Sequence, residues 1–373
     1  MEPILANDFK RQWDAIREPA LAAADRVGCS GWLILGREVD AFERELADSW
    51  DLPHAIGFGN CLDATELALR ALDLQPGEPV LTTPLSAFAT TLAIVRAGGR
   101  PVFCDVDSRG LIDLDRAEAC LAKDNAPRFF VPVHLYGFPL DMARLAAIRE
   151  RSGTRIIEDC AQSIGAVQGG VKAGAAGHIA VTSFYPTKNL GAMGDGGAAL
   201  TRDSELDAAL RSLRDYGQTE KYVHALLGSN SRLDELHAAI LRDALLPRLG
   251  GFTKHRRAVA AAYRARLANP LIEIPAEPED AECACHLFPV LAPRERRDEF
   301  LAYLRDEKIG AAIHYPMVIP DQPALIDAPA GFEVLDALEN ARSIADREVS
   351  LPIHPFLRDA EVDRVVEVVN AWR

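Results

Sequence analysis

Short apolar runs alternate with helical patterns between about residues 55 and 200. Several runs are apolar at nearly every position, which is typical of strands covered on both faces of a sheet. Between them, Phe88, Thr91, Leu92 and Val95 stand at i, i+3, i+4 and i+7, on one face of a predicted helix. This alternation predicts a mostly parallel sheet wrapped by helices. The predicted strands cover residues 80–81, 101–106, 128–134, 154–160 and 178–185.

The pattern changes near residue 250. Residues 203–247 are predicted to form helices separated by a loop rich in Gly, Ser and Asn, and LDELHAAILRDALL is strongly amphipathic. Beyond Gly251, long helical stretches accompany the strand-like run HLFPVLA. The chain of 373 residues is long enough for two domains. We predict an α/β protein with a large domain over residues 1–250 and a smaller α+β domain over residues 251–373.

Composition and charge exclude several classes of function. The net charge is −14 and no long Lys/Arg block is present, which argues against a nucleic-acid partner. Without an apolar signal core or a run of about 18 apolar residues, we expect no membrane association and a cytoplasmic location. The seven cysteines are an odd number, which favours buried thiols. Cys283-Ala-Cys285-His286 lacks a second ligand pair at zinc-site spacing, so we expect no metal.

The stretch GFGNCLDATELALRAL, residues 57–72, predicts a helix that begins after Asn60 as N-cap, with Asp63 in a relation like that of a capping box. A glycine-rich turn that leads into a helix N-terminus presents free backbone N–H groups, which can bind a phosphate. An ordinary capped helix is the alternative, because no Walker or Rossmann spacing is present.

Two further motifs carry reactive groups. In RIIEDCAQSIG an apolar strand ends in Glu158-Asp159, with Gln162 soon after, and ligands gather at the carboxyl ends of parallel strands. A structural acid is the alternative there. In SFYPTKNLGAMGDGG, Lys188 follows the next strand, 29 positions after Asp159, so both groups can reach one cleft. We expect the glycines after Lys188 to admit close approach of a ligand, although a solvated loop lysine is the alternative.

A phosphate cradle, a carboxylate at a strand end and a lysine in a glycine-rich loop together suggest pyridoxal phosphate. Lys188 would form the Schiff base, and Asp159 would keep the pyridine nitrogen protonated, which makes the ring an electron sink.

These motifs resemble those of one family, the fold type I sugar aminotransferases of the DegT/DnrJ type, which depend on pyridoxal phosphate. The resemblance runs almost end to end, through SGWLILGREVDAFE, GNCLDA, VPVHLYG, IIEDCAQSIGA, SFYPTKNLGAMGDGG, GSNSRLDELHAAIL and IHYPM. It implies an aspartate-aminotransferase-like fold, with a large domain built on a mainly parallel mixed sheet and a small C-terminal domain. It also implies a homodimer with shared active sites.

The resemblance assigns roles residue by residue. Lys188 and Asp159 match the two catalytic groups, and Gln162 matches the residue near the ring hydroxyl. Asn230, together with Arg232, would reach the phosphate from the other subunit. The remaining cofactor-binding positions are Asn60, Cys61, Leu62, Asp63, Ala87 and Ser183, and the expected substrate contacts are Tyr185, Tyr222, His224, His314 and Tyr315.

Three positions depart from the family pattern. Cys61 stands where the family usually has Gly, and His237 replaces a common Gln. An aromatic residue normally stacks on the cofactor at the position of Ala87, whereas this chain has Phe88 one place later. Which of the two faces the ring is left open by the sequence.

The resemblance implies ping-pong transamination of a nucleotide-linked keto sugar, with glutamate as donor and 2-oxoglutarate as product. KNLGAMGDGG and KYVH are more similar to enzymes that aminate carbon three than to those that act on carbon four, so a TDP-linked 3-keto-6-deoxyhexose is the expected substrate. The alternatives are a UDP-linked 3-keto N-acetylated sugar or uronic acid, and a regulator that holds the cofactor without catalysis. A dehydratase is disfavoured, because those members replace the lysine by histidine.

Overall fold

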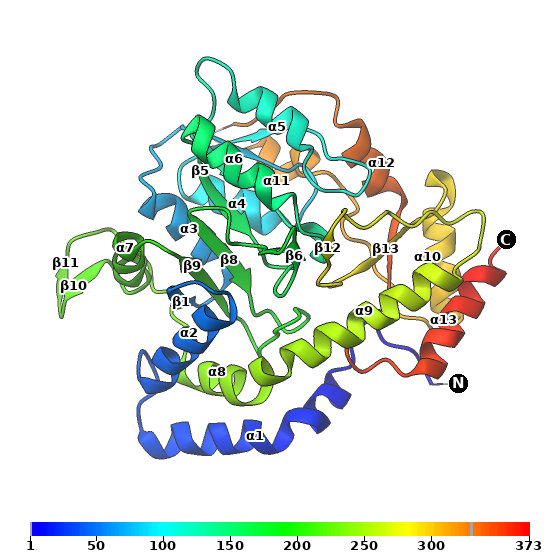
Figure 1. Cartoon of the computed structure of the whole chain (residues 1–373), viewed down its shortest axis with the longest axis horizontal. Coiled ribbons are helices and arrows are strands. Elements are labelled where there is room, and N and C mark those ends of the chain that lie inside the picture. The colour runs from blue at the N-terminus through cyan, green and yellow to red at the C-terminus, as the bar shows by residue number, and fades with distance from the viewer. Residues whose placement is uncertain (1, 329–330) are drawn as a thin grey trace.

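The largest element of the fold is a mixed sheet of eight strands. The computed structural model describes residues 2–328 and 331–373 (Figure 1). Strand β9 runs antiparallel to both of its neighbours, and the other strand pairs are parallel, as the sequence predicts. In sheet order the strands are β1 (His54–Phe58), β9 (Gly197–Thr201), β8 (Ile179–Ser183), β5 (Arg155–Asp159), β4 (Phe129–Val131), β2 (Pro79–Thr82), β3 (Arg100–Phe103) and β14 (Glu333–Val334).

All five predicted strands are present, most of them shorter than predicted. The run 128–134, for example, contributes only Phe129–Val131 to the ladder. Pro132 has no backbone N–H to donate, so the ladder ends before it. The predicted strands are therefore confirmed to exist along the chain in this order, but most of the predicted ranges extend beyond the strands that form.

Both faces of the sheet are covered, which explains the continuous apolar runs. Neighbouring strand residues such as Ile156 and Ile157 belong to two different core clusters, because successive side chains alternate between faces. One face packs against α3 (Cys61–Ala71), α4 (Phe88–Arg96) and α7 (Ser204–Arg214). The other packs against α2 (Arg37–Ser49), α5 (Leu114–Leu121) and α6 (Met142–Ser152).

The remaining elements surround this layered body (Figure 1). The long helix α1 (Phe9–Ser30) contacts α8 (Glu235–Ile240) along one side. A second, two-stranded sheet joins β13 (Phe288–Leu291) to β15 (Glu348–Leu351). Further helices are α9 (Leu249–Arg266), α10 (Arg297–Asp306), α11 (Pro323–Ile326), α12 (Glu339–Arg347) and α13 (Asp359–Ala371), and further strands are β6 (Val167–Gln168), β7 (Val171–Lys172) and β12 (Ala281–Glu282).

The predicted boundary between domains at residues 250 and 251 falls inside a helix, because α9 begins at Leu249. Two strands from the second half of the chain also pair with the first half: β14 lies beside β3, and β12 lies beside β6. The division into 1–250 and 251–373 therefore stays a prediction.

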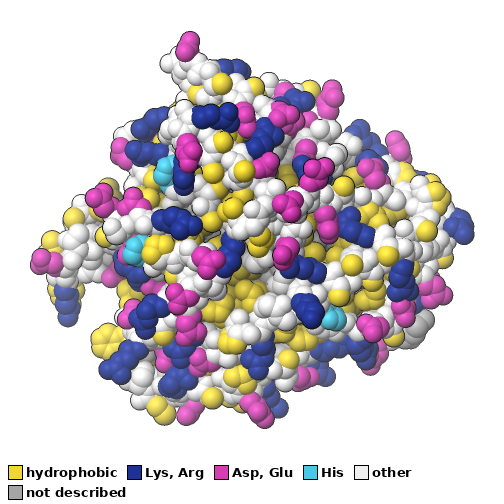
Figure 2. Space-filling view, viewed as in Figure 1, with side chains coloured by type: hydrophobic (Ala, Val, Ile, Leu, Met, Phe, Trp, Pro, Cys, Tyr) yellow, Lys and Arg dark blue, Asp and Glu magenta, His cyan; other side chains and the backbone are white. Residues whose placement is uncertain are grey.

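A small hairpin stands out from the body of the molecule. It consists of β10 (Gln218–Glu220) and β11 (Val223–His224) and lies at the left of Figure 1. Figure 2 shows Lys and Arg interspersed with Asp and Glu over the face in view. Within residues 2–328 and 331–373, no helix is long and apolar enough to cross a membrane.

Candidate functional site

Strand β8 delivers Lys188 to the carboxyl edge of the sheet. The strand ends at Ser183, and a turn closed by the hydrogen bond from the Lys188 N–H to the Tyr185 carbonyl follows it (2.8 Å). Burial lowers the pKa of Lys188 below its usual value, and the negative charge of Asp159 nearby opposes this shift. A lysine in such surroundings has a larger share of free amine at neutral pH than an exposed lysine has.

Asp159 is the last residue of β5, and it lies beside β8. The two strands are parallel neighbours, with Asp159 opposite Val181, so their carboxyl ends meet at one edge of the sheet. The buried Asp159 carboxylate accepts hydrogen bonds from the Thr90 hydroxyl (2.7 Å) and the Ala161 N–H (3.0 Å). The expectation that Lys188 and Asp159 share one region is therefore confirmed by the strand order.

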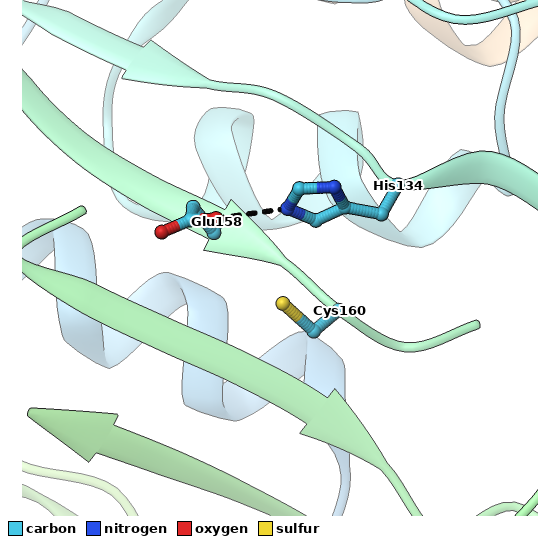
Figure 3. Close-up of side chains that lie close together, drawn as sticks. All are labelled: His134, Glu158 and Cys160. Atoms are coloured by element: carbon cyan, nitrogen blue, oxygen red, sulfur yellow. Dashed lines mark hydrogen bonds and ion pairs between the residues drawn. The ribbon is translucent and has the colours of Figure 1, made fainter. Parts of the chain in front are cut away.

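The neighbouring acid, Glu158, points to the opposite face of β5 and has a structural role. Its buried carboxylate accepts the backbone N–H groups of Gly174, Ala176 and Gly177. It also accepts a hydrogen bond from His134 Nε2 at 2.9 Å (Figure 3). Successive strand residues alternate between faces, so the pair Glu158-Asp159 divides into one structural acid and one acid at the site.

His134, Glu158 and Cys160 bring three potential metal ligands within 4.8 Å of one another (Figure 3). The His134 Nδ1 atom accepts the Leu140 N–H (3.0 Å), which leaves Nε2 to carry the proton donated to Glu158. Both ring nitrogens are thus engaged, and neither offers the free lone pair that a metal requires. This cluster therefore fixes the loop after β5 through its hydrogen bonds.

The N-terminus of α3 forms the candidate phosphate cradle. The Asn60 side chain caps the helix by accepting the Asp63 N–H (2.8 Å), and its Nδ2 donates to the Asp63 carboxylate (2.9 Å). Among the described residues, the N–H groups of Cys61 and Leu62 have no hydrogen-bond partner. The cap thus occupies the Asp63 N–H, which the sequence assigned to the phosphate, and leaves the two N–H groups before it open at the positive end of the helix dipole.

Gly197 brings this cradle against the sheet. A Cβ atom at Gly197 would lie 2.5 Å from the Cys61 backbone nitrogen, and one at Gly191 would lie 2.2 Å from the Pro186 carbonyl oxygen. Gly191 and Gly197 therefore admit close approach of the protein's own backbone. The expectation that the glycines after Lys188 also admit a ligand stays a prediction. Ser183, at the end of β8, pairs with Gly197 and so lies at the same edge.

Gln162 joins the sheet edge to the C-terminal part of the chain. Its Oε1 atom accepts the Tyr136 N–H (2.6 Å), and its Nε2 atom donates to the Tyr315 hydroxyl (3.2 Å). The Tyr136 hydroxyl in turn donates to the His314 carbonyl (2.8 Å). Burial and the charge of Lys188 lower the pKa of His314 to about 4, so its imidazole is neutral at pH 7. Two of the predicted substrate contacts, His314 and Tyr315, thus lie next to Gln162 and near Lys188.

The packing of Phe88 bears on which residue faces the cofactor ring. Phe88 packs against the buried cluster formed by Phe103, Ile319 and Leu325. Ala87 is the N-cap of α4, one turn before Thr90, which binds Asp159. This arrangement favours Ala87 as the residue beside the ring, and its role stays a prediction.

Four predicted residues are not brought to this group by the fold of one chain, whereas Tyr185 lies in the turn that carries Lys188. Tyr222 is 79% exposed, and the exposed His224 donates from Nδ1 to the Tyr216 carbonyl (3.0 Å). Arg232 pairs with Asp215 (2.6 Å) and lies over the Tyr216 ring, and the exposed Asn230 forms a bridge with Asp215. All four, Tyr222, His224, Asn230 and Arg232, lie on the protruding hairpin or in the loop that follows it.

The sequence missed three groups that bind the site residues. Thr90 and Tyr136 hold Asp159 and Gln162, and although Tyr136 lies in the motif VPVHLYG, the sequence assigned neither residue a role at the site. The third is His286, which the sequence considered only for a metal. Its Nδ1 atom lies 3.2 Å from Oδ1 of Asn189, the residue after Lys188. The segment around His286 therefore supports the lysine turn.

These groups fit pyridoxal phosphate. A partly buried amine, a buried carboxylate with further acceptor capacity and two open helix N–H groups meet at the carboxyl edge of one sheet. This fold and this set of groups define the fold type I class of enzymes that depend on pyridoxal phosphate.

Within that class, the chain belongs to the DegT/DnrJ/EryC1/StrS aminotransferase family, which matches residues 14–370. The aminotransferases of this family use pyridoxal phosphate, so the protein is a pyridoxal-phosphate-dependent sugar aminotransferase.

Three characterised relatives match nearly the whole chain. The dTDP-3-amino-3,4,6-trideoxy-alpha-D-glucose transaminase of Streptomyces venezuelae is 39% identical over 98% of this chain and 95% of its own. The UDP-N-acetyl-3-dehydro-alpha-D-glucosamine 3-aminotransferase of Acidithiobacillus ferrooxidans is 36% identical over 97% and 96%. A pleiotropic regulatory protein of Geobacillus stearothermophilus is 38% identical over 97% and 96%.

Solved structures agree with this assignment. DesV of S. venezuelae superposes with a TM-score of 0.94, at 38% identity, over 100% of this chain and 99% of its own. NtdA of Bacillus subtilis, with its bound cofactor PMP, gives a TM-score of 0.84 at 29% identity, over 94% of this chain and 80% of its own. The predicted fold class is therefore confirmed.

Proposed function

We propose that this protein transfers an amino group from glutamate to carbon three of a TDP-linked 3-keto-6-deoxyhexose. The products are 2-oxoglutarate and the TDP-linked 3-amino sugar. The exchange balances, because the sugar's keto oxygen replaces the amino group and hydrogen that glutamate loses. The similarity to the S. venezuelae transaminase, together with the position of Lys188 near Asp159 at the sheet edge, supports this proposal.

The chain's own groups have separate tasks in this reaction. When bound, pyridoxal phosphate supplies the aldehyde that takes up the amino group and the ring that withdraws electrons. Lys188 Nζ accepts and returns the proton at the reacting carbon, for which its lowered pKa suits it. Asp159 provides the negative charge for the ring nitrogen, and Thr90 holds that carboxylate in place. The Cys61 and Leu62 N–H groups would hold the phosphate.

A second substrate class is supported by a specific similarity. The A. ferrooxidans relative, whose name gives a UDP-linked N-acetylated sugar, is almost as similar to this chain as the transaminase for the dTDP sugar is. A UDP-linked 3-keto N-acetylated sugar or uronic acid is therefore the alternative substrate.

A panel of substrates distinguishes between these two substrate classes. The protein, loaded with pyridoxal phosphate, is incubated with glutamate and with TDP-, UDP- or GDP-linked keto sugars, and 2-oxoglutarate and the amino sugar are measured by mass and NMR. Lys188→Ala provides the inactive control. We expect the highest kcat/KM with a TDP-linked 3-keto-6-deoxyhexose. Preference for a UDP-linked sugar would select the alternative, and absence of turnover with every sugar would favour a regulator that only holds the cofactor.

We also propose that the working form is a homodimer with shared active sites. The hairpin segment, residues 218–228, exposes large apolar side chains, with Tyr222 at 79% and Leu227 at 88%, beside the exposed Asn230. Exposed apolar side chains grouped on a protrusion are typical of a surface that packs against another chain. In the dimer, Asn230 and Arg232 would complete the partner's phosphate site.

Complementation tests this sharing. Lys188→Ala and the double variant Asn230→Ala/Arg232→Ala are each expected to be inactive. Refolded together in equal amounts, half of the dimers carry both kinds of chain, and one of their two sites is intact. We expect about a quarter of the wild-type activity to return. No recovery in a mixture shown to contain mixed dimers would contradict the sharing, and the panel above would still decide the reaction.

A further inference from the structure

A chain of three polar side chains runs from His314 into the protein interior. The His314 Nδ1 atom lies 3.0 Å from the Ser350 hydroxyl, and the Ser350 hydroxyl hydrogen-bonds to Glu348 Oε1. Glu348 and Ser350 both lie on β15 and are buried, with Glu348 0% exposed. The strand alternation places both on the same face, so one strand carries both residues behind His314. We call the hydrogen-bonded series His314, Ser350 and Glu348 the relay.

The backbone fixes the geometry of this chain. Ala312 and Ser350 exchange two backbone hydrogen bonds, which attach the segment before His314 to β15. The His314 N–H donates to Glu348 Oε2 at 2.5 Å. Tyr136 holds the His314 carbonyl from the other side. His314 can therefore change the position of its ring protons much more easily than the position of its ring.

Proton counting then links Glu348 to His314. When Glu348 is ionised, the Ser350 hydroxyl donates to Oε1, so its oxygen accepts from His314 and the proton lies on Nδ1. When Glu348 is protonated, the His314 N–H already occupies Oε2, so the proton lies on Oε1 and is donated to Ser350. The Ser350 hydroxyl must then donate to His314 Nδ1, and the ring proton lies on Nε2.

We propose that Glu348 and Ser350 are positioning residues that set the tautomer of His314, and so decide whether its Nε2 atom accepts or donates a hydrogen bond at the active site. Within the described part of the chain, this Nε2 atom has no hydrogen-bond partner. The role of His314 toward substrate rests on the proposed function, whereas the relay itself does not.

Charges around the relay support a switch at mild alkaline pH. Burial raises the pKa of Glu348 to about 8, opposed by its hydrogen bonds from His314 and Ser350 and by the charge of Arg297. None of the ion pairs among residues 2–328 and 331–373 includes Glu348. Burial raises the pKa of Tyr136 and of Tyr315, the charge of Glu348 adds to both shifts, and Lys188 faces His314. As the pH rises through about 8, the proton of His314 is expected to move from Nε2 to Nδ1.

The test is the tautomer of His314, read by 1H–15N NMR of the full chain labelled with [15N]histidine and loaded with pyridoxal phosphate, without sugar or amino donor. His314→Gln assigns the signal. Wild type should change from the Nε2–H to the Nδ1–H tautomer between pH 6.5 and 9.5. Glu348→Gln, whose amide permanently donates to Ser350, should keep Nε2–H throughout. Buried His286 is the internal control, because its Nδ1 atom faces Asn189 and not the relay.

Ser350→Ala and Ser350→Thr form the matched pair, and they also serve if Glu348→Gln does not fold. Removal of the hydroxyl should abolish the pH dependence of the tautomer, and Thr, which keeps a hydroxyl, should restore it. The proposal is overturned if wild type and Glu348→Gln give the same tautomer at every pH, or if Ser350→Ala still switches. Because no substrate is added, failure of the sugar panel would leave this outcome unaffected.

Discussion

The contact between Gly197 and the N-terminus of α3 provides the sharpest test of the phosphate cradle. In Gly197→Ala, the new Cβ would lie 2.5 Å from the Cys61 nitrogen and 2.6 Å from the Asn60 carbonyl carbon. Ordinary van der Waals contact begins at 3.4 Å, so β9 and α3 must separate by about 0.9 Å (3.4 minus 2.5). All of these atoms belong to the backbone, so a side-chain rotation cannot relieve the overlap.

Two losses are expected from this separation. Overpacking of this kind costs about 1–3 kcal/mol of folding free energy. The Cys61 and Leu62 N–H groups would also move relative to Ser183, and a hydrogen bond to a charged group contributes about 1.5–3 kcal/mol. Loss of one such bond corresponds to a 10- to 100-fold weaker affinity for pyridoxal phosphate, by the rule of about 1.4 kcal/mol for each factor of ten.

The assay compares two glycine substitutions. Apo protein is unfolded in urea to obtain the free energy of unfolding, and pyridoxal phosphate is titrated by its absorbance. Gly250→Ala is the control, since Gly250 lies in α9 and a Cβ at this position would have no atom within 4 Å, and Ala in a helix should stabilise by about 0.5–1 kcal/mol. If Gly197→Ala unfolds like wild type and binds the cofactor equally well, the assignment of the cradle to this contact is wrong.

Three further substitutions and one chemical modification test other parts of the structure. Glu158→Gln places an amide against backbone donors, so we expect a loss of about 3–5 kcal/mol in urea unfolding. Asp159→Asn should instead leave the free energy of unfolding within about 1 kcal/mol of wild type and lower kcat at least 100-fold. Equal effects of the two variants on stability and on kcat would refute the division into a structural Glu158 and a catalytic Asp159. Hydrogen bonding by Arg11 lowers the pKa of Glu361 from 4.5 to about 2, so its stabilisation is present above pH 4.5 and is lost as the pH falls toward 2. Glu361→Gln should reduce the acid-induced loss of folding free energy by about 1–2 kcal/mol, after allowance for solvent screening. A wild-type urea midpoint that does not change between pH 5 and pH 3 would contradict this. Borohydride reduction of the holoprotein should attach the cofactor to the peptide that contains Lys188, and attachment elsewhere would overturn the site.

The sheet and the two reactive groups could be predicted from local sequence because their signals are local. Buried strands are recognised by continuous apolar runs, and a parallel sheet brings the ends of successive strands to one edge. The Asn60 cap is likewise visible from its own turn, and the structure forms it with the predicted partner, Asp63. For these features, a few neighbouring residues contain the physical cause.

The hairpin β10–β11 could not be predicted in the same way. Its strands contain three and two residues, expose most of their side chains and show no alternation between apolar and polar positions. Without a buried face, a strand leaves no hydrophobic period in the sequence. The sequence therefore predicts no strand in QTEKYVH, where the structure has paired strands.

The partners of the site residues were missed for a different reason, which is separation along the chain. Thr90 lies 69 positions from Asp159, and Tyr315 lies 153 positions from Gln162. Thr90 has an ordinary local context, and although the motif IHYPM indicated Tyr315 as a substrate contact, only the fold makes it a neighbour of Gln162. The relay behind His314 belongs to the same category, since Glu348 and Ser350 look like any polar residues of a short strand.

The two groups of site residues also differ in what supports them, and this difference bears on substrate choice. Lys188, Asp159 and the start of α3 are fixed by the eight-stranded sheet, whereas His314 and Tyr315 are held by β15 and by two long-range hydrogen bonds. The expected substrate contacts Tyr222 and His224 lie on the exposed hairpin. A rigid sheet edge can therefore keep one cofactor chemistry while the peripheral segments vary. This separation gives a physical reason why relatives of nearly equal similarity are named for differently linked sugars.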